Sequence, residues 1–420
     1  MRVKMTLAVL ALAALALALP ASSLADGSRG EAGESIRVIA TGLNDPRGID
    51  ADDADHGDRL LVAQSGSGEI TEILVRKKGD SVIGAFAALT ADSFPSDVVG
   101  YGFNKAFVTA GVPPEAGVGD PFGGLVKVRR GGESSVVANI TAYQEGDPDP
   151  VDQEELPTES NPFGVALVRH GVLVTDAAGN DLLKVKKNGS IETVARFPTR
   201  TLKVPEGLPE GPPAGTEIEA EAVPTAVAVG PDGAWYVSEL RGFPFSKGAS
   251  RIWRIKPGTE DAECDPDAKR GPCRVFADGF TSVIDLAWAG DTLLVLELVK
   301  EGLLAAEAGT APPIGALWAV ERNSKREIAP GALLAPGGVA VADEERLYLT
   351  TGTLLGPGAG AVVRIKAALD EDHGDDDRGD GKGHHSEDDD HGDRKHKNKK
   401  HKNKKHKKHK KHMKHDRDDD

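Results

Sequence analysis

A short motif returns six times along this chain and limits what the chain can fold into. The motif is a proline, once replaced by valine, followed by two residues and an apolar run. Its copies read PRGIDA, PSDVVG, PFGVAL, PTAVAV, VIDLAW and PGGVAV, and they begin at Pro46, Pro95, Pro162, Pro224, Val283 and Pro336. Self-similar units of this size indicate a repeat architecture in which neighbouring units bury each other's apolar faces.

Each copy opens a unit of short strand-like runs. The second runs read RLLVAQ, KAFVTA, GVLVTD, AWYVSE, TLLVLE and RLYLTT, and the third read GEITEI, GLVKVR, DLLKVK, SRIWRI, GALWAV and AVVRIK. Alternating β-branched runs between Gly and Pro turns are typical of hairpins. The pattern therefore predicts an all-β chain of six units.

A fourth run follows in only five of the units. The sixth unit, which ends in AVVRIK, lacks it, whereas SIRVIA at residues 35–40 belongs to no unit of its own. A ring leaves no exposed sheet edge there if the N-terminal run supplies the missing outer strand. We therefore expect residues 35–368 to form a six-bladed β-propeller closed by an N-terminal strand.

The first residues predict export. Residues 1–25 combine Arg2 and Lys4 with a long uncharged run and with small residues before a cleavage point after Ala25, which is the pattern of a signal peptide. A membrane anchor is the alternative, but no basic stop-transfer cluster follows the run. We expect a secreted protein, extracellular or in the cell envelope, without a stable membrane anchor.

The two cysteines of the chain agree with export. Cys264 and Cys273 lie nine positions apart between two strand-like runs. In an oxidising compartment we expect them to form a disulfide across one surface loop. Zinc is the other interpretation, although two thiolates without a nearby histidine make a poor tetrahedral site.

The C-terminal segment differs in composition. From residue 370 the chain is almost wholly Asp, His, Lys, Gly and Asn, so we expect residues 369–420 to form a disordered tail. Sixteen acidic residues balance sixteen Lys and Arg in it, and the net charge of −15 therefore belongs to the preceding body. An acidic body argues against nucleic acid as a partner.

Histidines recur through the basic part of this tail. Their spacing suits Zn²⁺, Ni²⁺ or Cu²⁺, although the lysines between them lower the affinity by repulsion. The alternative is a solvated segment that keeps the protein soluble or holds the cell envelope loosely. The candidate metal ligands are His396, His401, His406, His409, His412 and His415.

Most long insertions fall in two kinds of connection, from an outer strand to the next inner strand and from a second to a third strand. In an antiparallel four-stranded blade both kinds emerge on the same face, here called the loop-rich face. Loops on a rigid scaffold commonly carry function, so we predict the ligand site on this face. The insertions are residues 143–160, 203–222, 111–122, 240–248 and 299–314.

Several stretches together resemble the ScyD/ScyE family of exported bacterial proteins. They are SNPFGVALVRHGVLVTDAAGNDLLKV (160–185), VPTAVAVGPDGAWYVSELRGFPFSKGASRIWRI (223–255), FTSVIDLAWAGDTLLVLE (280–297) and GLNDPRGI (42–49). The resemblance covers about residues 37–365, and AAGND and RGFPF are its most specific words. It implies an NHL-like six-bladed propeller without an established reaction, and the charged tail is not part of the family pattern.

Two aspartates stand out at the third position of the motif. Four copies carry glycine or alanine there, whereas the second and fifth carry Asp97 and Asp285. These two units face each other across a six-fold ring, so we expect two carboxylates near the channel mouth. They could hold a hard cation such as Ca²⁺, act as an acid/base pair, or accept backbone N–H bonds at a strand start.

Carboxylates also end three of the second strands. Asp176, Glu239 and Glu297 would point toward the loop-rich face, and Asn180 and Asp181 follow in the loop after Asp176. Such oxygen clusters suit a metal or a polyol. The alternative is that they tie neighbouring loops through backbone hydrogen bonds.

Two aromatic residues lie in the insertion 240–248. Phe243 and Phe245 flank a proline in RGFPF. They would either line a pocket or form a packed plug in the loop.

These residues leave two classes of function. The first is a binding module of the ScyD/ScyE type, with no certain cofactor, for a small molecule or a cell-envelope polymer. The alternative is a cation-dependent hydrolase, a lactonase similar to the SMP-30 group, that holds Ca²⁺ or another divalent cation on the same face. A quinoprotein sugar dehydrogenase is disfavoured, because the body's histidines, His56 and His170, fall in turns of the opposite face. No nucleophile elbow or phosphate loop is present, so we name no catalytic residue.

Overall fold

The structure of this protein is a computed structural model that describes residues 35–54, 57–77, 80–89, 93–111, 123–206, 212–321, 324–343 and 346–366. The predicted signal peptide (1–25) and the predicted tail (369–420), with its six histidines, lie outside these residues. The described part is built from strands, apart from two short helices. The all-β prediction is therefore confirmed.

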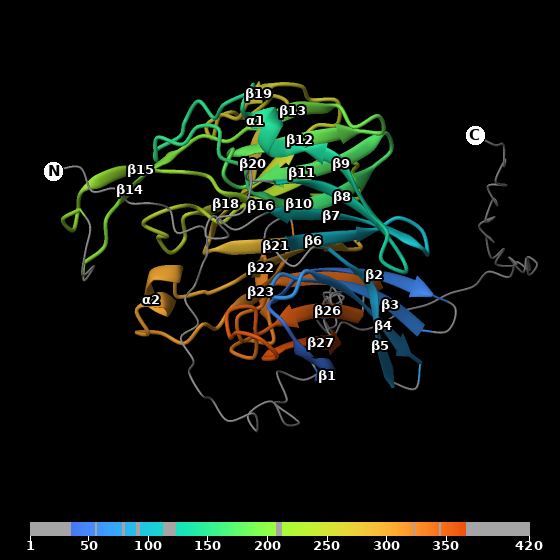
Figure 1. Cartoon of the computed structure of the whole chain (residues 1–420). Helices are drawn as coiled ribbons and strands as arrows, with labels where there is room; N and C mark the ends of the chain where they lie inside the picture. The colour runs from blue at the N-terminus through green and yellow to red at the C-terminus, as the bar shows by residue number, and fades with distance from the viewer. Residues whose placement is uncertain are drawn as a thin grey trace, which may run out of the picture. The chain divides into compact units, whose positions relative to one another are not determined.

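Six antiparallel sheets, the blades, make up the fold (Figure 1). Blade 1 consists of β2 (Pro46–Ala54), β3 (Gly57–Gln64), β4 (Glu69–Arg76) and β5 (Ser81–Ala88). Blade 2 consists of β6 (Phe94–Gly100), β7 (Lys105–Gly111), β8 (Gly123–Arg129) and β9 (Ser134–Asn139). Blade 3 consists of β10 (Pro162–Val168), β11 (Gly171–Asp176), β12 (Asp181–Lys186) and β13 (Ile191–Arg196). Blade 4 consists of β16 (Pro224–Val229), β17 (Trp235–Glu239), β18 (Ser250–Ile255) and β20 (Cys273–Phe280). Blade 5 consists of β21 (Val283–Ala289), β22 (Thr292–Glu297), β23 (Ala316–Val320) and β24 (Lys325–Ile328). Blade 6 consists of β25 (Gly338–Asp343), β26 (Arg346–Thr351), β27 (Gly360–Lys366) and β1 (Ser35–Leu43).

The blades close into a ring. Their first strands contact one another in the cyclic order β2, β6, β10, β16, β21 and β25, and β25 returns to β2. The N-terminal strand β1 pairs antiparallel with β27, so that Ser35 lies opposite Lys366. The prediction of a six-bladed propeller closed by an N-terminal strand is confirmed.

The recurring motif places each inner strand against the next blade. In five blades the pairing between the first and second strands is irregular just after the motif begins, for example between Pro46 and Ile49. The third motif position then packs against the neighbouring inner strand. A Cβ on Gly48 would lie 2.0 Å from Oδ1 of Asp97, and one on Gly338 would lie 3.2 Å from Cα of Gly48. The tiny residues are therefore needed for the close approach of inner strands around the axis.

Buried hydroxyl groups join consecutive blades near the start of the motif. Ser65 Oγ donates to the Pro95 carbonyl at 2.5 Å, and Thr109 Oγ1 donates to the Phe163 carbonyl at 2.6 Å. Thr350 Oγ1 closes the ring by donating to the Arg47 carbonyl at 2.6 Å. Each such bond satisfies a backbone carbonyl that would otherwise be buried without a partner.

The remaining elements decorate the ring. The connection from β9 to β10 begins with α1 (Ile140–Gln144), whose first turn is capped by Asn139 Oδ1 accepting from the Ala142 N–H at 3.0 Å. The connection from β13 to β16 forms a hairpin of β14 (Arg200–Lys203) and β15 (Glu217–Ala220), and the connection from β22 to β23 holds α2 (Leu303–Glu307). Within the described residues no helix has the length and apolar character needed to cross a membrane.

The predicted disulfide is present. Cys264 follows β19 (Ala262–Glu263), a short strand that pairs parallel with β13, and Cys273 begins β20. The two cysteines are bonded, with their Cα atoms 5.3 Å apart. The bridge therefore closes the loop between the third and fourth strands of blade 4, as expected.

Candidate functional site

The two aspartates of the motif each join two blades. Asp97 Oδ1 accepts the Val98 N–H at 2.8 Å, and its Oδ2 accepts the Val165 N–H of the next blade at 2.9 Å. Asp285 repeats this arrangement with the N–H groups of Leu286 at 2.8 Å and Val339 at 2.7 Å. The expectation that these carboxylates accept N–H bonds at strand starts describes these contacts, and both side chains also border a cavity.

The cavity lies along the axis and measures about 370 Å³. All six inner strands line it, mostly with Val, Ala, Leu and Ile side chains, and Trp288 adds an aromatic wall. Among the described residues that line it, the charged side chains are Asp50, Asp97 and Asp285, and none is Lys, Arg or His. Asp50 Oδ2 accepts the Gly100 N–H at 2.8 Å, so this third carboxylate also joins two blades.

The carboxyl groups in the cavity have raised pKa values. Burial raises the pKa of Asp285 to about 7, although the Val339 and Leu286 N–H groups oppose the shift. Burial raises the pKa of Asp97 well above its ordinary value, and the charge of Asp285 adds to the effect. Burial also raises the pKa of Asp50 to about 6. Burial therefore raises both pKa values, and the charges of Asp97 and Asp285 act on each other.

The two ends of the cavity differ in exposure. At the loop-rich end the first two residues of every motif are buried, except Arg47, whose side chain is 16% exposed. Phe163, Leu240 and Ile284 belong to one apolar cluster at this end, with Phe245 packed against it. At the opposite end the cavity residue Val229 is 41% exposed. We infer that the cavity meets solvent on the face opposite the loop-rich face.

The carboxylate that ends β11 is buried among donors. Asp176 accepts the Asn161 N–H at 2.6 Å, the Ser160 hydroxyl at 2.7 Å and the Gln144 amide at 3.2 Å. Its Oδ1 also accepts the Gly179 N–H at 3.2 Å. Burial raises the pKa of Asp176, and these donors oppose the shift. The side chain therefore fixes the turn after β11 and the start of blade 3.

Asp181 lies beside Asp176 but has fewer donors. Gln144 Nε2 donates to Asp181 Oδ2 at 3.0 Å, whereas Asp181 Oδ1 and Gln144 Oε1 are buried without a partner. Burial raises the pKa of Asp181 well above its ordinary value, and the charge of Asp176 adds to the effect. Protonation removes the charge from a buried carboxyl whose Oδ1 has no donor, so we infer a neutral acid at this position.

This inference gives opposite expectations for two neighbouring substitutions. Asp181→Asn replaces the protonated acid with a neutral amide that also carries a donor, and it should raise the free energy of unfolding at neutral pH by about 1–3 kcal/mol. Asp176→Asn turns an N–H toward the Gln144 donor and should lower the free energy of unfolding by a similar amount. Because the folded pKa of Asp181 is raised, the wild type loses stability as pH rises above the ordinary carboxyl pKa, and the gain from Asp181→Asn should grow with pH. Urea unfolding from about pH 4 to about pH 7 measures both; a destabilised Asp181→Asn would contradict a neutral Asp181.

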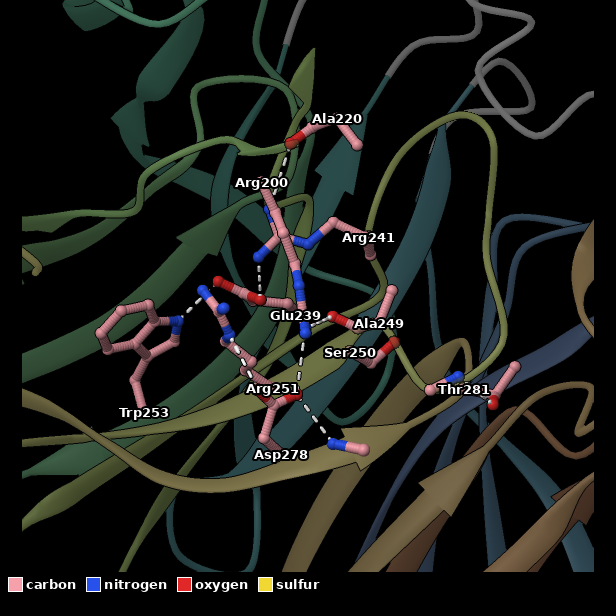
Figure 2. A network of polar contacts seen from close by, with 12 residues as sticks. Arg200, Ala220, Glu239, Arg241, Ala249, Ser250, Arg251, Trp253, Asp278 and Thr281 are labelled. Carbon is pink, nitrogen blue, oxygen red and sulfur yellow. Dashed lines mark hydrogen bonds and ion pairs between the residues drawn. The ribbon is translucent and has the colours of Figure 1, made fainter. Parts of the chain in front are cut away.

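Glu239 at the end of β17 lies in a buried ion pair. Figure 2 shows its carboxylate between Arg241 and Trp253. Trp253 Nε1 donates to Glu239 Oε1 at 2.5 Å, and Arg241 donates to Oε2. The side chains of Glu239 and Arg241 are both fully buried. Arg241 also donates to the Ala220 carbonyl at 3.1 Å, which ties the hairpin β14–β15 to blade 4.

The other predicted residues of the loop-rich face also have internal contacts. Asn180 donates to Asp149 Oδ2 at 2.9 Å and accepts the Val223 N–H at 2.9 Å. Glu297 accepts the Thr281 N–H at 2.7 Å. The rings of Phe243 and Phe245 meet edge to face at 6.3 Å, and both are half-buried. Asp176, Asn180, Asp181, Glu239 and Glu297 thus tie loops together, and their role in ligand binding stays a prediction.

A group of carboxylates that the sequence did not single out lies off the axis. Ligand oxygens of Asp152, Glu154 and Glu221 come within 4.8 Å of one another, where the connection from β9 to β10 meets the segment before β16. Burial raises the pKa of Glu154 to about 8, and the charge of Glu221 adds to the effect. Gln153 N–H donates to Glu221 at 2.6 Å. The sequence marked both segments as insertions, but only their folding brings the carboxylates together.

Two other features of the site had a weak sequence signal or none. Asp50 stands at the fifth position of the first motif copy, so an alignment of that position as well as the third would have found it. Arg241 begins the stretch RGFPF, but its pairing with Glu239 follows only from its complete burial beside that residue.

Comparisons with known proteins give only distant similarities. No protein-family model and no curated protein matches the chain. Solved structures do match, among them the PQQ-bound aldose sugar dehydrogenase of Streptomyces coelicolor, at 14% identity and a TM-score of 0.48 over 79% of this chain and 98% of that one. A putative glucose dehydrogenase of Thermus thermophilus shares 18% identity at a TM-score of 0.48, over 79% of this chain and 100% of that one. A putative gluconolactonase shares 11% identity at a TM-score of 0.43, over 80% of this chain and 92% of that one. At these TM-scores and identities we take neither fold nor function from the similarity.

Proposed function

We propose that this protein is a binding module whose ligand is a small molecule held in the axial cavity. The observation that carries the proposal is the cavity of about 370 Å³, with apolar walls and with Asp97 and Asp285 at its border. Its volume lies in the range of small-molecule pockets, and pockets of this kind combine apolar walls with a few placed polar groups. Membership of the ScyD/ScyE family and export by a signal peptide belong to the same proposal, supported by the sequence resemblance and the disulfide.

A fragment screen with a blocked cavity tests the proposal. Saturation-transfer NMR on the full mature chain would compare cationic, neutral and anionic fragments. Ala287→Leu adds volume to a residue that lines the cavity, and Ala85→Leu makes the same change at an exposed position of β5. We expect the signals of cavity ligands to disappear in Ala287→Leu and to persist in Ala85→Leu. Fragments that bind both variants equally would place the ligand elsewhere and overturn the proposal.

A cation-dependent hydrolase is the second candidate, and the carboxylates Asp152, Glu154 and Glu221 favour it. Carboxylate oxygens suit Ca²⁺, which usually takes six to eight oxygen ligands. Among the described residues, three ligand oxygens lie within 4.8 Å of one another in this loop group, whereas the axial carboxyl groups of Asp50, Asp97 and Asp285 form no such group. The residues first considered for the cation were Asp97, Asp285, Asp176 and Glu239, and each of them has internal hydrogen-bond partners.

Elemental mass spectrometry separates the two candidates. The untagged chain, with and without residues 370–420, would be dialysed against Ca²⁺ and Zn²⁺. A binding module predicts a shortened chain that binds fragments in its cavity without bound metal. A stoichiometric cation in that shortened chain, lost on Glu221→Gln, would favour the hydrolase. Metal found only in the longer chain would belong to the segment that carries the six histidines.

A further inference from the structure

The cavity combines a charge and a shape that point to one class of ligand. Three carboxyl groups border it, and no basic side chain of the described part of the chain does so. The rest of its wall is aliphatic apart from Trp288. Building on the proposed function, we infer that the ligand is an organic monocation, with an ammonium group at Asp97 and Asp285 and an apolar body along the inner strands.

The carboxylates retain the capacity to receive an ammonium group. Each oxygen of Asp97 and Asp285 accepts one backbone N–H, and a carboxylate oxygen has two lone pairs. Both side chains are half-buried rather than sealed. Because a charged hydrogen bond in an apolar surrounding is stronger than one in water, the pair favours a cation over a neutral alcohol.

The ionisation of the pair favours one positive charge. Burial raises the pKa of Asp285 to about 7 and also raises the pKa of Asp97, so burial favours the protonated forms of both groups. The other charged groups nearby are Asp50, with Asp52 and Arg59 beyond it. Binding of a cation should therefore release protons from the pair, and affinity should increase with pH.

The overall charge supports the same class. The net charge of −15 belongs to the body, because the charges from residue 370 onward cancel. An acidic body raises the local concentration of cations and disfavours anions. An anionic or strongly polar ligand would meet carboxylates and aliphatic walls instead of complementary partners.

Three probes of similar shape and different charge test the inference: phenethylamine, phenethyl alcohol and hydrocinnamate. Titration calorimetry on the full mature chain at about pH 8 and about pH 5 would measure affinity and proton release. We expect the amine to bind about tenfold more tightly than the alcohol at the higher pH, and to lose that advantage at the lower pH. Hydrocinnamate should not bind.

A matched pair of variants locates the contact. Asp285→Asn removes a cavity carboxyl, whereas Asp291→Asn changes an exposed residue of the same hairpin. The amine should lose about tenfold in affinity in the first and nothing in the second. Should Asp285→Asn fold poorly, the proton release of the wild type in buffers of different ionisation enthalpy decides the point.

The failures of the inference and of the proposed function are distinguishable. Equal affinity for amine and alcohol, with both lost in Ala287→Leu, would overturn the cation class and keep the cavity as the site. If the probes bound Ala287→Leu with unchanged affinity, the proposed function itself would be overturned. Amine binding without proton release would contradict the role of the aspartate pair.

Discussion

Arg241→Met is expected to lower the free energy of unfolding by about 3–5 kcal/mol. The substitution leaves Glu239 fully buried with its charge uncompensated, and only Trp253 remains to donate to it. It also removes the donor to the Ala220 carbonyl, so the hairpin β14–β15 should exchange its amide hydrogens faster. Chemical denaturation measures the first effect, and hydrogen exchange measures the second.

A partner substitution and a nearby arginine control this result. Glu239→Gln in the Arg241→Met background removes the stranded charge while keeping an acceptor for Trp253, and it should recover part of the loss. Arg251 belongs to the same network in Figure 2 but pairs with Asp278, whose side chain is 39% exposed. Arg251→Met should therefore cost about 1 kcal/mol or less. Equal losses for the two arginine variants would contradict the importance given to the buried pair.

Gly48→Ala is expected to cost about 3–4 kcal/mol. A Cβ at this position would lie 2.0 Å from Oδ1 and 2.5 Å from Cα of Asp97. Since the second of these atoms belongs to the backbone, blades 1 and 2 must move apart at the axis. The same movement displaces Asp97 from the cavity border, so binding of a cavity ligand should weaken together with stability.

Gly84→Ala is the matched control for the glycine. Gly84 lies on the outer strand β5, and a Cβ there would meet no atom within 4 Å. Its replacement should change the unfolding free energy by no more than about 0.5 kcal/mol. If Gly48→Ala proved as mild as this control, the close packing of inner strands would not be what the motif encodes.

The architecture followed from the sequence because its signal is repeated. Six motif copies, five fourth strands and one unassigned N-terminal run lead to a ring in which β1 pairs with β27. The same alignment brought out Asp97 and Asp285, since they break a row of tiny residues. Each of the two aspartates bonds to the next blade in the same way and borders the same cavity, as expected for equivalent positions of a repeat.

The surroundings of the candidate site were less accessible to sequence analysis. Asp176, Glu239 and Glu297 end their strands as expected, but whether a carboxylate at a strand end faces a ligand or a loop depends on what folds over it. Gln144 and Arg241 come from insertions without a repeat, and they occupy two of these carboxylates. The burial of the loop-rich end of the axis likewise depends on how insertions pack against each other.

A crystal grown with a bromine-labelled phenethylamine tests the central claim most directly. The anomalous signal of bromine locates the ligand without assumptions about its pose. We expect a peak between the inner strands in the axial cavity, with the ammonium group at Asp97 and Asp285. A peak among the loops at Asp152, Glu154 and Glu221, with an empty axis, would contradict it.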